Sequence, residues 1–276
     1  MDSVLQTMTA QRVAAGARLV CARSGGRTRL QRLRQEGAAR ISLPAVAGGP
    51  LQAVLINTAG GLTGGDRLAW EVEVGQHGDA VVTTQACERI YRAGSGQAEV
   101  RVALSVGDNG RIAWLPQETN LFDRSAFARS LDVELGAGAE ALILEATLFG
   151  RLAMGEHVDR ARFSDRWRVR RQGRLVHAEA FRIGPDVEGA LPRAAVAGGN
   201  AAMATLLFVS PRAGELVDAV RAIAGEAGGA SFWSVGDTGK LLARLVAEDG
   251  YSLRRRLVPL VELLNGLAGL PKLWSL

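Results

Sequence analysis

The chain has 276 residues, of which 47% are hydrophobic, and its formal net charge is +5. This composition predicts a folded protein with a sizeable core and excludes an intrinsically disordered chain. No apolar run reaches the roughly 18 residues that a membrane span needs, and the N-terminus lacks the apolar segment of a signal peptide. We therefore expect a cytoplasmic protein without a membrane partner.

The positive charge comes almost entirely from arginine, because lysine occurs only at Lys240 and Lys272. A basic chain can bind nucleic acid or an acidic partner surface. Here acidic residues are interleaved along the chain and aromatic residues make up only 5%. We expect the arginines to serve protein interfaces, where arginine is enriched, and a basic nucleic-acid-binding or other interaction module remains the alternative.

Cysteine and histidine are too scattered to form a preassembled metal site. Cys21 and Cys87 are far apart, and His77, His157 and His177 have no histidine or cysteine neighbour in sequence. This spacing argues against a structural disulfide and against a zinc site of the usual kind. A metal site would have to be built from carboxylates or assembled with a partner chain.

The first two thirds of the chain predict a succession of strands. A strand is expected at 17–22, and the arginine-rich segment 27–36 fits either a two-faced strand or a solvated helix. From 51 to 147, apolar or alternating runs recur about every 8–12 residues between glycine turns, which is typical of an antiparallel or solenoid-like β architecture. The Gly-Asp-Asn-Gly sequence at 107–110 predicts a hairpin with 111–115 as its return strand. No repeat of fixed length supports a strictly periodic β-helix.

The last third predicts more strands and then helices. Two strands are expected at 163–169 and 173–181, followed by a loop at 184–200 and a buried strand at 201–209. A helix is expected at 215–224, a short strand at 232–235 and a second helix at 253–264. Pro259 falls inside the second helix, where it must start a turn or produce a kink. Trp274 is costly to expose, so we expect the end of the chain to be pinned to the fold.

A glycine-rich stretch at 57–66 is the first candidate for a functional loop. A phosphate cradle and a sharp strand–turn–strand corner both fit its glycines. A P-loop needs lysine where Asp66 stands, and a carboxylate there would repel phosphate. We therefore expect a β corner in which Asp66 binds backbone N–H groups, as aspartate does in turns.

Two further kinds of chemistry can be weighed from the residues. Cys87 has no histidine close in sequence, and the chain contains no G-x-S-x-G motif for a serine nucleophile. We therefore expect Cys87 to be a small buried residue, although a hydrolase using Cys87 or a carboxylate pair remains the alternative. Glu145 stands in the apolar run 141–146, where a charge needs a partner or water. It either faces solvent, pairs with an arginine, or lines an internal path along which a cation passes.

Four segments in order, at 57–66, 83–92, 114–123 and 149–156, resemble the signatures of the UreD (UreH) family of urease accessory proteins, as does the closing 270–274. The resemblance covers residues 16–276 as a single domain and leaves 1–15 as a flexible N-terminus. Cys87 stands where the family pattern has a small residue. The motif positions that carry the resemblance are Asn57, Gly60, Gly61, Gly64, Gly65, Asp66, Gln85 and Glu88.

The resemblance implies a mainly β fold with two sheets in an irregular helical, β-helix-like arrangement and a few C-terminal helices. It implies a non-enzymatic partner of apo-urease and UreF, and of the GTPase UreG through UreF, in GTP-dependent nickel insertion. No tightly bound cofactor is expected, only nickel in transit through an internal passage. The candidate residues for this path are Glu118, Asp123, Glu145, Glu156 and His157.

Overall fold

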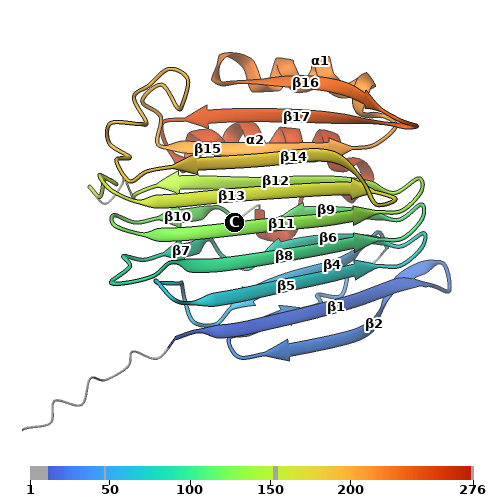
Figure 1. The fold of residues 1–276 in the computed structure, drawn as a ribbon. Helices are drawn as coiled ribbons and strands as arrows, with labels where there is room; N and C mark the ends of the chain where they lie inside the picture. Colours follow the sequence, from blue (N-terminus) through green and yellow to red (C-terminus); the bar gives the residue numbers. More distant parts are fainter. Residues whose placement is uncertain (1–11, 47, 152–154, 275–276) are drawn as a thin grey trace, which may run out of the picture.

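The computed structural model describes residues 12–46, 48–151 and 155–274, which form two stacked β-sheets and two helices (Figure 1). Sheet A contains β1 (Ala14–Ser24), β2 (Arg27–Glu36), β5 (Arg67–Val74), β8 (Ala98–Val106), β11 (Ala126–Leu135), β13 (Arg162–Arg171) and β14 (Arg174–Ile183). Sheet B contains β3 (Ala39–Ser42), β4 (Leu51–Asn57), β6 (Asp79–Thr84), β7 (Glu88–Ile90), β9 (Arg111–Leu115), β10 (Thr119–Leu121), β12 (Glu140–Phe149), β15 (Ala202–Val209), β16 (Gly228–Val235) and β17 (Thr238–Ala247). The helices are α1 (Ala213–Ala224) and α2 (Gly250–Asn265).

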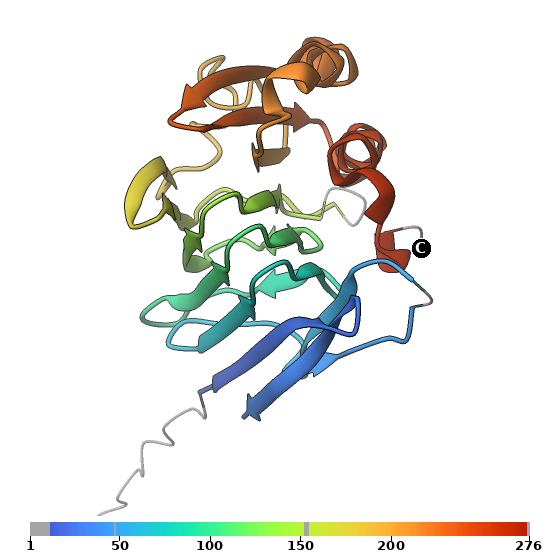
Figure 2. The ribbon, with the colours of Figure 1, turned by 90° about the vertical axis from the view of Figure 1, so that its right-hand side faces the viewer.

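The middle of the chain winds as a solenoid. It alternates between the sheets, so that β5, β8, β11 and β13 are parallel neighbours in sheet A and β4, β6, β9 and β12 are parallel neighbours in sheet B. Figure 2 shows the chain crossing from one layer to the other. Antiparallel strands close both sheets at the C-terminal side, where β13 pairs with β14 and β12 with β15. The expected two-sheet, β-helix-like fold with C-terminal helices is confirmed.

The hairpin predicted at 107–110 is wrong, because β8 and β9 lie in different sheets. The turn instead carries the chain from sheet A to sheet B and stacks on the equivalent turns of the neighbouring coils. His77 N donates to Asp108 O (2.9 Å), and Asn109 N donates to Ala137 O (2.7 Å). A Cβ on Gly107 would lie 2.7 Å from Gln76 N, so glycine is required by the stacking. The Gly-Asp-Asn-Gly sequence at 107–110 therefore fits a corner between the sheets as well as a hairpin turn.

Other differences from the sequence expectations are small. The segment 27–36 is the strand β2, and the strand β17 was not predicted. Both helices are present, and α2 continues through Pro259 to Asn265. No helix in the described part of the chain is long and apolar enough to cross a membrane.

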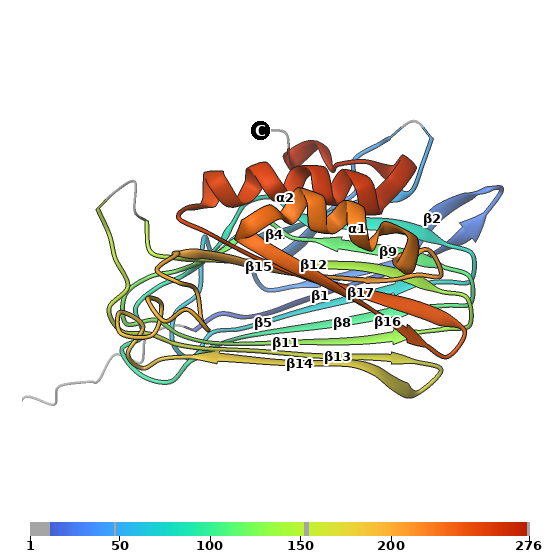
Figure 3. The same ribbon diagram turned by 90° about the horizontal axis from the view of Figure 1, so that it is seen from above.

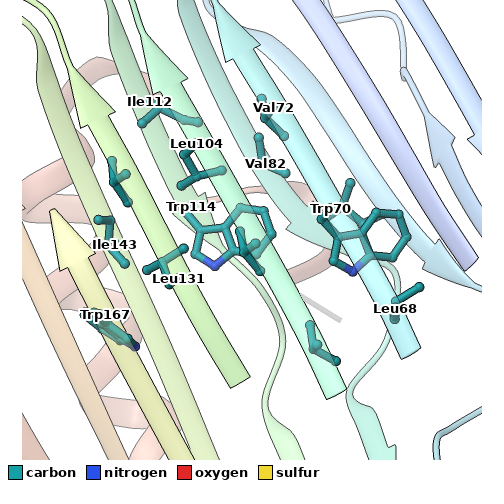
Figure 4. Packing of buried hydrophobic residues seen from close by; sticks show 14 of the residues in the cluster. Leu68, Trp70, Val72, Val82, Leu104, Ile112, Trp114, Leu131, Ile143 and Trp167 are labelled. Atoms are coloured by element: carbon teal, nitrogen blue, oxygen red, sulfur yellow. The ribbon is translucent and has the colours of Figure 1, made fainter. Parts of the chain in front are cut away.

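Two hydrophobic layers hold the fold together. Between the sheets, alternate residues of facing strands interlock, among them Trp70, Trp114 and Trp167 (Figure 4). The second layer lies between sheet B and the helices, where Leu115 and Leu144 belong to one cluster with Leu257. Figure 3 shows α1 and α2 together on the sheet B side of the molecule. Sheet B is therefore buried on both faces over much of its area, which explains the continuous apolar pattern of β12.

The end of the described chain is pinned, as expected. Trp274 is 3% exposed and its Nε1 donates to Leu115 O (3.1 Å) and to Thr83 Oγ1 (3.3 Å). The guanidinium of Arg254 lies over the indole, 5.1 Å from its centroid. This contact attaches the C-terminal segment to both α2 and sheet B.

Candidate functional site

The four motif segments gather at one end of the solenoid. Each follows a strand of sheet B, and parallel strands place their carboxyl ends on the same edge of a sheet. The short strands β7 and β10 pair with each other, and β10 also pairs with the end of β12 (Figure 1). Residues 152–154 of the fourth motif lie outside the described residues.

The glycine stretch is a closed corner around Asp66. Its carboxylate accepts hydrogen bonds from Val13 N and Thr63 N, both at 2.8 Å. A Cβ on Gly61 would lie 2.4 Å from the Tyr91 ring, and one on Gly64 would lie 2.1 Å from Ser95 O. Gly60 and Gly65 have φ values of 76° and 93°, which favour glycine. The corner is packed against its own chain and does not form a phosphate cradle.

A hydrogen-bonded pair connects this corner to the second motif. Asn57 Nδ2 donates to both carboxylate oxygens of Glu88, at 3.0 and 3.2 Å. Burial raises the pKa of Glu88 to about 7, against the opposing effect of the Asn57 hydrogen bond. Gln85 N donates to Leu55 O (2.8 Å) and its side chain is exposed. Cys87 is partly buried, and its sulfur accepts a hydrogen bond from Asn120 (3.4 Å).

Three of the five candidates for a nickel path have partners elsewhere in the fold, and a fourth lies at the surface. Glu118 pairs with Arg254 of α2 at 2.8 Å, and Glu156 pairs with Arg151 at 2.7 Å. Asp123 accepts hydrogen bonds from the backbone N–H groups of residues 159 and 160. His157 is exposed. Across residues 12–46, 48–151 and 155–274, no three His, Cys, Asp or Glu side chains are grouped closely enough to hold a metal ion.

The fifth candidate, Glu145, points between the two sheets and is 5% exposed. It accepts a hydrogen bond from Trp114 Nε1 (2.9 Å) and one from Arg129 Nη1. Arg129 also donates from Nε and Nη2 to Asp165, at 3.1 and 2.6 Å. Arg129, Glu145 and Asp165, which we call the buried triad, therefore join sheet A to sheet B through one guanidinium shared by two carboxylates.

The electrostatics of the buried triad are set by burial and by its unequal charges. Burial raises the pKa of Glu145 to about 7, Arg129 acts to lower it, and the charge of Asp165 raises it further. Burial opposes the charge of Arg129, but the two carboxylates outweigh this effect and hold the Arg129 pKa above its usual value. When both carboxylates are ionised, the triad carries one net negative charge in the interior.

The triad faces a cavity of about 550 Å³ between the sheets. Thr147, Trp167 and Met203 line the same space, as does the pair formed by Glu179 and Arg244, whose charged atoms are 2.5 Å apart. Trp167 Nε1 is buried and lacks a hydrogen-bond partner in the described structure. The cavity thus combines carboxylate side chains with one unused hydrogen-bond donor.

Sequence reasoning missed Arg129 and Asp165. Both occupy inward-facing positions of alternating strands, since Arg129 lies between Phe127 and Leu131, which are both buried. A charge at an inward position is the signal that would have marked them, as it marked Glu145.

The fold and the cavity define a two-sheet β-solenoid protein with a pocket between its sheets that opens to solvent near Arg182 and Glu226. The family model described as UreD urease accessory protein matches residues 13–275, and the chain belongs to this family. It is 70% identical over 267 residues to the urease accessory protein UreD of Mesorhizobium japonicum, covering 97% of this chain and 95% of that protein. It is 57% identical over 275 residues to UreD 1 of Brucella abortus, covering 100% and 98% of the two chains. The resemblance stated from the motifs is confirmed.

Proposed function

We propose that this urease accessory protein is a cytoplasmic, non-catalytic scaffold for nickel insertion. It binds apo-urease and UreF, and UreG through UreF, and GTP hydrolysis belongs to UreG. Membership of the UreD family supports this proposal, and the motif segments gathered at one solenoid end offer a surface built from several coils. Nickel is its cargo in transit and not a resident cofactor.

The observation that carries the nickel role is the carboxylate pair at the inter-sheet cavity. Glu145 and Asp165 place carboxylate oxygens at the cavity between the sheets, and when both are ionised their charge exceeds that of Arg129 by one. A buried excess of negative charge favours a cation over an anion. Carboxylates hold nickel more weakly than thiolate or imidazole clusters do, which suits passage more than storage.

The contacts of the five candidate residues reduce the set that we propose for the nickel path. We assign Glu145 and Asp165 to the passage. Glu118, Asp123 and Glu156 have backbone or arginine partners and serve the fold around it. His157 is exposed and is retained as a candidate contact at the surface.

A pull-down with purified apo-urease and UreF tests the scaffold role. We expect the tagged chain to retain both proteins together, and UreG only when UreF is present. Failure to retain either protein would contradict the proposal.

A further inference from the structure

Strand β2, at the edge of sheet A, carries four exposed arginines on one face. We call them the arginine row: Arg27, Arg29, Arg32 and Arg34. Their partners in the neighbouring strand β1 are every second residue from Arg18 to Ser24, so the four side chains point to the same side of the sheet. This is the outer side, because the intervening β1 residues Leu19 and Cys21 are fully buried in the core between the sheets.

A β-bulge at Gln31 produces this alignment. Leu30 pairs with Cys21 and Arg32 pairs with Val20, so Gln31 has no partner in β1. Side chains alternate along a regular strand, and the third and fourth arginines would then point to the side opposite the first two. The extra residue of the bulge reverses that alternation. Two separate pairs of arginines thereby become one row.

Three arginines of the row keep an unneutralised charge. Arg34 pairs with Glu36 at 2.9 Å, but Arg27, Arg29 and Arg32 form no ion pair with any described residue. Opposite them in β1 lie only small uncharged side chains, at positions 20, 22 and 24. Neighbouring like charges repel one another, so an anionic partner on this face would relieve the repulsion.

The free edge of β2 offers a second means of binding. β2 is the last strand of sheet A, and its outer edge pairs with no strand in the part of the chain that the structure describes (Figure 1). Such an edge can accept a strand from another chain, although charged side chains commonly prevent this. Here all the unpaired charges have one sign, which disfavours a second copy of β2 and favours a strand with carboxylates.

We propose that β2 is a docking site for an extended acidic segment of a protein partner, which adds to its free edge as a further strand. Same-face side chains of a strand recur about every 6.6–6.8 Å, so carboxylates at alternate positions match the arginine row. Opposite charges directly across a strand pair stabilise it. The site goes beyond the nickel role and does not rest on it, since β2 contributes no residue to the lining of the inter-sheet cavity.

The composition of this surface favours a peptide over a nucleic acid. Neither β1 nor β2 contains an aromatic residue, whereas proteins that bind single strands commonly stack bases on aromatic rings. Glu36 ends the row with a carboxylate that would repel a continuous chain of phosphates. The backbone groups at the strand edge are the partners that another polypeptide backbone uses.

The test is fluorescence anisotropy at low salt, with the purified full-length chain and a labelled eight-residue peptide in which glutamate alternates with threonine. We expect binding that weakens when the four glutamates are made consecutive or when the peptide backbone is N-methylated. The triple variant Arg27→Gln/Arg29→Gln/Arg32→Gln should bind about tenfold more weakly, because each exposed ion pair changes an equilibrium constant by up to about fivefold. Arg29→Glu, in the middle of the row, is a second variant in case the triple variant does not fold, and it should also weaken binding.

A second triple variant controls for net charge. Arg174, Arg193 and Arg212 are exposed and form no ion pair with described residues, so replacing all three with glutamine removes the same charge elsewhere. This control should bind the peptide as the wild type does. An equal loss in both triple variants, or no binding by the wild type, would overturn the docking site. So would tighter binding of an eight-residue oligothymidylate, or of phosphatidylserine vesicles, that the arginine row variants lose.

Discussion

Asn57, at the end of β4, donates both of its hydrogen bonds to the carboxylate of Glu88, which begins β7 in the next coil. The pair joins the first two family motifs at the end of the solenoid where all four motifs lie. Glu88 thereby has a pH-dependent effect on stability, and the direction of that effect follows from its pKa.

Burial raises the Glu88 pKa from 4.5 to about 7, so the folded chain binds more protons than the unfolded chain between these values. The stabilisation that Glu88 adds to the free energy of unfolding is fully present at pH values below its pKa of 4.5 in the unfolded chain. It is lost as the pH rises through about 7, its pKa in the folded chain. We predict that Glu88→Gln lessens the loss of stability between about pH 5 and about pH 8, as measured by urea unfolding. The pKa of Glu145 is also raised, but Glu145 is present in both the wild type and Glu88→Gln. The difference between the two proteins in the loss of stability therefore reports on Glu88 alone. Equal losses in the two proteins would contradict the account.

Removing the Asp66 carboxylate should destabilise the glycine corner. Asp66→Ala leaves the N–H groups of Val13 and Thr63 without their acceptor, and each such loss costs about 1–3 kcal/mol when the group stays dry. Asp66→Asn keeps one oxygen acceptor and should cost less. Thermal unfolding of both variants measures the difference, and an Asp66→Ala protein as stable as wild type would disprove the role of the corner.

Trp274 should be necessary for the attachment of the C-terminal segment. Trp274→Ala removes a buried indole and two hydrogen bonds, so we predict a loss of about 3–5 kcal/mol in the free energy of unfolding. Hydrogen exchange in α2 should rise, because Arg254 loses the aromatic face on which it lies. Leu267→Ala, at an exposed apolar residue, is the control. Unaltered exchange in α2 would show that the helix is held by its own apolar face alone.

Glu145→Gln should lower urease activation in a reconstituted system without dissociating the complex. The substitution keeps the size of the side chain and removes the charge facing the cavity. Asp132→Asn, which breaks a surface pair with Arg166, is the matched control and should activate normally. Dissociation of the complex by Glu145→Gln would instead make the triad a structural element of the interface.

Much of this fold could be predicted from local patterns, and the exceptions share one physical cause. The alternation of β8 and β11 and the helical spacing in α1 and α2 are properties of single segments. Whether the turn at 107–110 folds back or crosses to the other sheet depends on the neighbouring coils, on which it stacks.

The candidate site likewise combines one residue that a local pattern marks with partners that only the fold brings close. Glu145 stood out because a charge interrupts an apolar run. Its partners Arg129 and Asp165 are 16 and 20 positions away in sequence and meet it only through the register of the coils and the stacking of the sheets. The inter-sheet cavity likewise belongs to no single segment.

The most direct test is the nickel content of urease purified from cells in which the gene for this chain is deleted. The account predicts that urease protein is present but lacks nickel and activity, and that the wild-type chain restores both. Nickel-loaded, active urease from the deletion strain would contradict it.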